Sequence, residues 1–176
     1  PVTLKNGYVD TVTAIGAMGD LTFENVTFRG ASNAINLDTN NAALYLQGTD
    51  KISNVLIDNC TFQGPASEDV TVAIATTNVE NLTVQNSTID GYTITAYHNP
   101  GNGGNISYLN NEIRNVTSGI AFIGTDGITV TGNTFENANG IRLEPSWSDS
   151  ADKCSDITIS ENKFVSVSKD DTYGQY

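Results

Sequence analysis

A single histidine and one adjacent pair of aspartates are the first residues to consider for acid–base chemistry. His98 is the only histidine, and it lies between Tyr97 and Asn99. The only adjacent pair of aspartates, Asp170 and Asp171, lies close to the C-terminus. Hydrolysis of a glycosidic bond needs two carboxyl groups that flank the bond as acid and base. The sequence therefore predicts no catalytic residues for a reaction of this kind.

The three arginines are the other candidates for catalysis. Elimination at a uronate sugar needs a base and a positive charge, or calcium, that neutralises the carboxylate. Arg29 and Arg114 each follow an apolar residue at an expected bend, and we expect both to be solvated. Arg142 alone is expected on an outward strand position. Elimination is therefore an alternative that the sequence does not favour.

The charge of the chain limits its partners. Eight Lys and Arg residues stand against twenty Asp and Glu residues, which gives a formal net charge of -12. A surface this negative repels polyanions. We therefore expect no binding to nucleic acid, to anionic membranes or to acidic polysaccharides, and we expect neutral partners or cations instead. No stretch of about 18 apolar residues predicts a membrane span.

An internal repeat carries these residues. The pattern apolar-x-apolar-x-(Asn/Gly/Glu)-x-x-(Phe/Ile) recurs six times, at intervals of 22 to 34 residues. Alternation of period two, β-branched residues and flanking Gly or Asn predict a strand followed by a tight turn in each copy. The copies are LTFENVTF from Leu21, VLIDNCTF from Val55, LTVQNSTI from Leu82, ISYLNNEI from Ile106, ITVTGNTF from Ile128 and ITISENKF from Ile157.

A second short apolar strand follows most copies. These strands are AINL from Ala34, VTVAI from Val70, YTITAY from Tyr92, GIAFI from Gly119 and GIRL from Gly140, with an additional ALYL from Ala43. No helical stretch separates the strands, and the Asn-Gly and Asp-Gly steps do not join strands of matched length. Stacked coils explain this spacing best, each adding about 4.8 Å along the axis. The sequence predicts an all-β fold, a right-handed parallel β-helix of about six coils.

The coil positions predict further detail. We expect one domain, with residues 1–19 as a cap or first partial coil, 20–168 as coils and 169–176 as a tail, within a longer protein. Cys60 and Cys154 lie about four coils apart, too far for a disulfide, so two free thiols are expected, one of them at a bend. Two bend positions rich in asparagine are expected to stack. One comprises Asn25, Asn59, Asn86 and Asn110, and the next comprises Asn111, Asn133 and Asn162.

This pattern resembles that of the pectate-lyase-like superfamily of right-handed β-helices over about residues 20–168, and the ITVTGNTF copy is the most recognisable. The resemblance implies the fold more strongly than the activity, because the superfamily includes lyases, hydrolases, epimerases, tailspikes, adhesins and binding modules. The Gly-His-Gly and Arg-x-Lys motifs of its polygalacturonases are missing from this sequence. In size, fold and acidity the chain is also similar to the β-helical xylan-binding modules of carbohydrate-binding module family 89.

The second strands predict a binding face. Their inward residues are expected to be Ile35, Leu37, Val72, Ile74, Ile94, Ala96, Ile120, Phe122, Ile141 and Leu143, with the residues between them, Ala73 among these, pointing outward. Neutral sugars stack on aromatic rings while polar side chains bind their hydroxyls. The candidate ligand-binding residues are Tyr97, His98, Arg142, Glu144, Trp147 and Thr95.

No cofactor and no metal site are predicted. Glu144, Asp149 and Asp152 could bind calcium, but their spacing matches no known cation loop, and solvated acids are the preferred interpretation. Six Asn-x-Ser/Thr sequences occur, and most of them coincide with bend positions that the fold requires. Their asparagines are Asn25, Asn59, Asn81, Asn86, Asn105 and Asn115.

The combined interpretation is a non-catalytic carbohydrate-binding module for a neutral plant polysaccharide, with xylan as the expected polymer. We expect it to be monomeric, extracellular or on a bacterial cell surface, and joined to a neighbouring domain that covers an open coil end. One alternative is a polysaccharide lyase or glycoside hydrolase, which requires Arg142, Glu144 and His98 to converge. The other alternative is an adhesin or a structural stalk.

Overall fold

The computed structural model describes residues 1–30, 42–65, 70–99, 101, 103–146 and 152–166 of the chain. No helix in this part of the chain is long and apolar enough to cross a membrane. Within these ranges there are sixteen strands, which are β1 (Val2–Val9), β2 (Val12–Ile15), β3 (Met18–Phe28), β4 (Ala42–Asp58), β5 (Thr61–Gln63), β6 (Val72–Gln85), β7 (Thr88–Asp90), β8 (Ile94–Asn99), β9 (Gly104–Leu109), β10 (Glu112–Val116), β11 (Ser118–Ile123), β12 (Asp126–Thr131), β13 (Thr134–Ala138), β14 (Ile141–Glu144), β15 (Ser155–Ser160) and β16 (Lys163–Val165).

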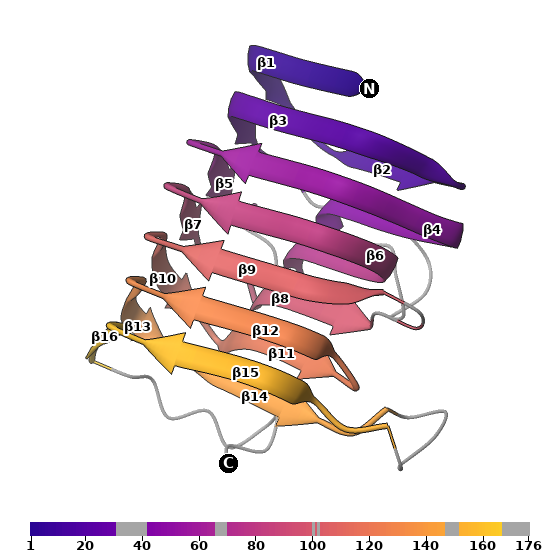
Figure 1. The fold of residues 1–176 in the computed structure, drawn as a ribbon. Coiled ribbons are helices and arrows are strands. Elements are labelled where there is room, and N and C mark those ends of the chain that lie inside the picture. The colour runs from indigo at the N-terminus through magenta and orange to yellow at the C-terminus, as the bar shows by residue number, and fades with distance from the viewer. Residues whose placement is uncertain (31–41, 66–69, 100, 102, 147–151, 167–176) are drawn as a thin grey trace.

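The strands stack into three walls that surround one apolar interior (Figure 1). Wall A contains β1, β3, residues 52–58 of β4, residues 79–85 of β6, β9, β12 and β15. Wall B continues from the ends of β1 and β3 through β5, β7, β10, β13 and β16. Wall C contains β2, residues 42–47 of β4, residues 72–77 of β6, β8, β11 and β14. Every one of these pairs is parallel, which confirms the predicted β-helix.

The repeat positions stack in register, as predicted. The first apolar residue of each copy forms the Val2 row, which contains Val2, Leu21, Val55, Leu82, Ile106, Ile128 and Ile157. The last apolar residue of each copy forms the Val9 row, which contains Val9, Phe28, Phe62, Ile89, Ile113, Phe135 and Phe164. Because parallel pairing in register places identical repeat positions on one line, each row packs apolar side chains on apolar neighbours.

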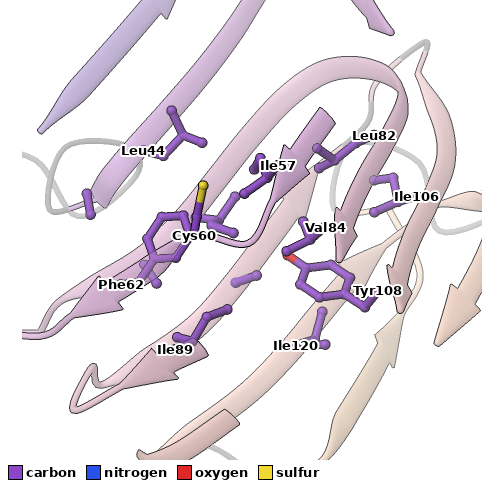
Figure 2. Close-up of a cluster of buried hydrophobic side chains, with 14 of the residues drawn as sticks. Leu44, Ile57, Cys60, Phe62, Leu82, Val84, Ile89, Ile106, Tyr108 and Ile120 are labelled. Carbon is purple, nitrogen blue, oxygen red and sulfur yellow. The ribbon is translucent and has the colours of Figure 1, made fainter. Parts of the chain in front are cut away.

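Aromatic stacking strengthens the Val9 row. The rings of Phe28 and Phe62 are stacked and nearly parallel, with 4.4 Å between centroids and 1° between planes. Phe135 and Phe164 stack in the same way at 4.8 Å. Figure 2 shows Phe62 and Ile89 in successive coils, both directed into the interior. The core is therefore a stack of ladders rather than a single cluster between two layers.

Of the predicted second strands, AINL from Ala34 lies outside the described residues. The additional strand ALYL is confirmed, since it is part of β4 and pairs with β6 in wall C. At the N-terminus, β1 pairs with β3 from Val2 opposite Leu21 to Val9 opposite Phe28. Residues 2–15 therefore add a layer of strands before the copy that begins at Leu21.

Asparagines at the bends adopt the left-handed conformation. Asn25, Asn59, Asn86 and Asn110 have φ values between 50° and 55°. All six asparagines of the Asn-x-Ser/Thr sequences have positive φ, at Asn25, Asn59, Asn81, Asn86, Asn105 and Asn115. Asparagine is tolerated there because its short polar side chain bonds locally. The left-handed backbone conformation thus explains why asparagine occurs at these positions.

Replacement of Asn81 is expected to separate backbone strain from side-chain bonding. Asn81 has φ 55°, donates to Asn54 Oδ1 at 3.2 Å and accepts from Asn105 Nδ2 at 3.2 Å. We expect Asn81→Ala to lower the free energy of unfolding by about 1–2 kcal/mol, because alanine is strained at positive φ. Asn81→Gly should cost less than half as much, since glycine is not strained there. Urea denaturation measures both, and equal losses would show that the bonds, not φ, set the cost.

A second asparagine ladder lies inside the bend between walls A and B. The side-chain oxygen of Asn133 accepts from both the backbone N–H and Nδ2 of Asn111, each at 2.9 Å. Asn133 in turn donates through Nδ2 to the Tyr108 carbonyl and to Asn162 Oδ1, each at 2.9 Å. Asn111 and Asn133 are buried. At the bend, backbone N–H and C=O groups have no partner in the sheet ladders, and these side-chain amides form hydrogen bonds with them instead.

The two cysteines are free, as predicted. Cys60 is buried at the bend between β4 and β5, and burial raises the pKa of its thiol. Cys154 is half-buried, with Sγ close to the carbonyl oxygens of Phe122 and Glu144. Cys60 occupies the same bend position as Asn111 and Asn133 in later coils, so it packs as part of the interior (Figure 2).

Candidate binding face

The candidate face lies on the outside of wall C, where six residues form a line across neighbouring strands. This outer row contains Thr13, Tyr45, Ala75, Tyr97, Ala121 and Arg142. Large and small residues alternate along it. Ala75 and Ala121 are buried, which is consistent with cover by the larger side chains beside them. The alternation gives each large side chain room to extend over its alanine neighbour.

The two tyrosines of the outer row differ in accessibility. Tyr45 is buried in a cluster with Ala42, Ala75 and Val72. Tyr97 is only half-buried. A ligand on this face would therefore meet the ring of Tyr97 and not that of Tyr45. Among the described residues, Tyr97 is the predicted aromatic contact that lies on the face.

Arg142 and Glu144 form an ion pair at the end of the outer row. Arg142 Nε lies 2.8 Å from Glu144 Oε1, and both residues are half-buried. They are two residues apart on β14, so they share one face of the strand. Arg142 pairs with Ala121, the residue next to Tyr97 in the row. The pair brings donor and acceptor groups to the face without adding net charge.

His98 lies inside the coil, which corrects its assignment to the binding face. Its Nδ1 is 2.8 Å from Thr76 Oγ1, and its Nε2 is 2.9 Å from the Tyr108 hydroxyl. Its ring stacks on Phe122 with 5.4 Å between centroids. Complete burial lowers the pKa of His98 to about 3, so the imidazole is neutral. It cannot contact a ligand outside the wall.

The position of His98 follows from the length of its strand. The sequence predicted a strand ending at Tyr97, but β8 continues to Asn99. The alternation that points Ala96 inward therefore points His98 inward as well. Thr76, its partner, was missed by the sequence reasoning. The segments around them are offset by 22 residues, and aligning these copies could have paired the two.

Thr95 is also excluded from the face. Strand alternation breaks at the start of β6, where Val72 joins the outer cluster while Ala73 and Ile74 both join the core. The predictions that Val72 points inward and Ala73 outward are therefore wrong. The register of β6 and β8 places Thr95 opposite Ala73, and Thr95 is likewise fully buried. Its hydroxyl has no hydrogen-bond partner among the described residues.

The other predictions for wall C have mixed outcomes. Four of the inward residues are confirmed in the core, namely Ile74, Ala96, Ile120 and Phe122. Trp147 and Asp149 lie outside the described residues, as do Ile35 and Leu37. Glu144, considered above as a calcium ligand but not preferred as one, is paired with Arg142. Within the part of the chain that the structure describes, no three His, Cys, Asp or Glu residues are grouped to hold a metal ion.

The other two arginines, expected to be solvated, contact neighbouring side chains at the surface. Arg114 pairs with Asp90 at 2.8 Å and with Glu112 at 3.0 Å on the outside of wall B. Partial burial of Asp90 opposes its ionisation. Hydrogen bonds from Asn115 and Arg114, together with the Arg114 charge, outweigh this effect, so the pKa of Asp90 is lowered. The guanidinium of Arg29 lies 3.9 Å from the ring centroid of Tyr8.

Comparison with known proteins bears on the fold. A family model described as "Right handed beta helix region" matches residues 3–163. Neither a search of curated proteins nor a search of solved structures returned a match. The matched range extends from β1 to the start of β16 and so includes all three walls.

Proposed function

This chain belongs to the right-handed β-helix family, and from that premise we propose that it is a non-catalytic carbohydrate-binding module for a neutral plant polysaccharide. Xylan is the expected polymer. The observation that carries the proposal is the outer row, in which Tyr97 and the Arg142–Glu144 pair lie on nearby strands of one wall. The similarity to carbohydrate-binding module family 89 is part of the proposal.

The chemistry of the face suits an uncharged sugar chain. An aromatic ring stacks on the C–H face of a pyranose, and paired charged groups exchange hydrogen bonds with its hydroxyls. Because Arg142 and Glu144 neutralise each other, the face offers no net positive charge to a polyuronate. The net charge of -12 adds long-range repulsion of acidic polymers. Both properties support a neutral polymer.

The enzyme alternative depended on Arg142, Glu144 and His98 lying together. The first two form an ion pair, but His98 is on the inner side of wall C and bonds to Thr76 and Tyr108. That constellation does not form, which supports binding over catalysis. The module is proposed to act beside a glycan-degrading domain, outside the cell or on a bacterial surface.

Replacement of Tyr97 is expected to weaken polysaccharide binding. Tyr97→Ala should reduce retention by xylan in affinity electrophoresis by about tenfold in apparent affinity, because the stacking contact is lost. Tyr8→Ala is the matched control, since Tyr8 is an exposed tyrosine outside wall C and should leave retention unchanged. Mixed-linkage glucan, mannan and pectin are compared in parallel gels.

Several results would contradict this function. Equal retention of Tyr97→Ala and the unaltered chain would show that Tyr97 on wall C is not a stacking site. Trp147→Ala tests the remaining aromatic candidate. Preference for pectin over xylan would refute the charge argument. Release of reducing or unsaturated ends from any of the polymers would favour the enzyme alternative. No binding to any polymer would favour the adhesin or stalk.

A further inference from the structure

A second outward row lies beside the outer row on wall C. This polar row contains Gln47, Thr77 and Asn99, which occupy equivalent positions in β4, β6 and β8. Asn99 lies two residues after Tyr97 on β8, so the two side chains leave the same face of the strand about 7 Å apart. Thr77 follows Ala75 on β6 in the same way. The polar row therefore runs beside the accessible ring of Tyr97.

The polar row has hydrogen-bonding groups that reach solvent. Gln47, Thr77 and Asn99 are each half-buried. Among the described residues, their amides and hydroxyl form no hydrogen bond with another side chain. The exposed asparagines at the bend between walls A and B differ in this respect, because Asn59 donates to Asn25 Oδ1 in the coil before it. The donors and acceptors of the polar row are thus available to a ligand.

Apolar side chains limit the polar row on both sides. Ile15 pairs with Gln47 in the coil before it. In the coil after Asn99, Ile123 occupies the corresponding position of β11, one residue after the partner of His98. Isoleucine forms no side-chain hydrogen bonds, so the hydrogen-bonding part of the row extends from Gln47 to Asn99, about 10 Å along the axis.

We propose that the polar row determines specificity on wall C by binding the hydroxyl groups of successive sugars, while Tyr97 stacks on one sugar ring. This inference rests on the proposed function. The polymer then runs along the stack, across β8, β6 and β4, because successive residues of the row are about 4.8 Å apart, close to the advance of an extended sugar chain per residue. The preferred ligand is a run of about three neutral sugars whose hydroxyls facing the row are unsubstituted.

The residue types of the row suit hydroxyl groups. Each amide of Gln47 and Asn99 has an NH2 donor and a carbonyl acceptor, and the Thr77 hydroxyl both donates and accepts. A sugar whose hydroxyl is blocked would cover one of these groups without bonding to it. An unbonded buried polar group costs more free energy than its hydrogen bond contributes. A site that binds hydroxyls therefore rejects derivatives that lack them.

Xylo-oligosaccharides of increasing length test the row by isothermal titration calorimetry. For the unaltered chain, we expect the affinity to rise from the disaccharide to the trisaccharide and to level off beyond it, since the row has three hydrogen-bonding residues. Thr77→Val removes one hydroxyl with little change in size, and it should weaken trisaccharide binding by about three- to tenfold. Asn99→Ala should weaken it to a similar extent.

Gln47→Ala tests the direction of the polymer, because Gln47 lies two coils away from Tyr97. A disaccharide stacked on Tyr97 does not reach Gln47, so its affinity should be unchanged. The trisaccharide and longer chains should bind about threefold or more weakly. A polymer that ran along β8 would never meet Gln47. Binding of every length like that of the unaltered chain would therefore overturn the direction along the stack.

Two variants on the same strand serve as matched controls. Thr83 and Gln85 lie in the wall A segment of β6 and, like Thr77 and Gln47, are half-buried and point outward. Thr83→Val and Gln85→Ala should bind every oligosaccharide like the unaltered chain. Circular dichroism and thermal unfolding of each variant establish that the fold is retained.

The outcomes separate this inference from the proposed function. If Tyr97→Ala weakens binding but the variants of the polar row bind like the controls, the row does not determine specificity, and the chain remains a carbohydrate-binding module. Equal losses in the controls and in the polar row would also overturn the inference, because binding would not be localised to wall C. If the unaltered chain binds no oligosaccharide and no polymer, both the inference and the proposed function are wrong.

Discussion

Acidification from pH 7 to pH 4 is expected to lower the free energy of unfolding by about 3 kcal/mol through His98 alone. Burial holds the pKa of His98 at about 3 in the folded chain, whereas an unfolded chain takes up this proton near pH 6.5. Between these values the unfolded state binds more protons, so acid favours unfolding. The stabilising contribution is complete above about pH 6.5 and is lost as the pH falls toward 3.

The matched control removes the titrating group without leaving its partners unbonded. Thr76 and Tyr108 bond directly to His98, and replacing every member of a buried polar group by an apolar residue of similar shape is nearly neutral. The triple variant Thr76→Val, His98→Phe, Tyr108→Phe should therefore lose less stability between pH 7 and pH 4 than the unaltered chain. Urea denaturation at several pH values measures the difference.

Carboxylates contribute to the pH dependence of both chains. Asp90, for example, has a lowered pKa and also loses its stabilising interactions as the pH falls. The difference between the two chains isolates the His98 contribution because these carboxylates are common to both. Parallel pH dependences of the triple variant and the unaltered chain would refute the assignment. In that case burial would not keep His98 neutral.

Asn133→Ala is expected to reduce the free energy of unfolding by about 3–5 kcal/mol, because it leaves buried polar groups unbonded and creates a cavity. The backbone N–H of Asn111 would lose its acceptor, and the Tyr108 carbonyl would lose a donor. The side-chain bonds to Asn111 and Asn162 would also be lost. Equilibrium denaturation in urea or guanidinium measures the loss.

Asn110→Gly is the control for this prediction, because Asn110 lies at the exposed bend position of the preceding coil with φ 55°. Glycine adopts this φ without strain, so the change should cost less than about 1 kcal/mol. The contrast tests whether the interior ladder stabilises the fold more than the outer one. Similar losses for the two variants would show that the interior amides are replaced by water or by backbone rearrangement.

Much of the fold could be predicted because the repeat is expressed directly in the sequence. Leu21, Val55 and Leu82 occupy equivalent positions in their copies, and parallel stacking in register makes equivalent positions neighbours. The same logic identified the asparagine bends. It also identified the strand at ALYL, which is part of β4 and pairs with β6 in wall C.

The binding face was predicted less well. Arg142, Glu144 and Tyr97 are on one face of wall C, but His98 and Thr95 are inside. His98 was misplaced because a polar residue after an apolar run is typical of a loop, and β8 in fact continues past it. Only its partners, Thr76 and Tyr108, make an inward imidazole acceptable, and they come from other strands.

The sequence by itself determined the stacking of the coils. Each copy is a strand of alternating residues that ends at an asparagine able to adopt the left-handed conformation, so each copy predicts its own bend. Because the copies repeat, equivalent positions of successive copies become neighbours in the stack. The tertiary structure decided which way residues point where the chain turns into wall C. There Val72 joins the outer cluster while Ala73 and Ile74 are both interior, which the local alternation of the sequence does not predict. It also decided that Tyr97 is accessible while Tyr45 is covered, because cover depends on segments distant in the chain.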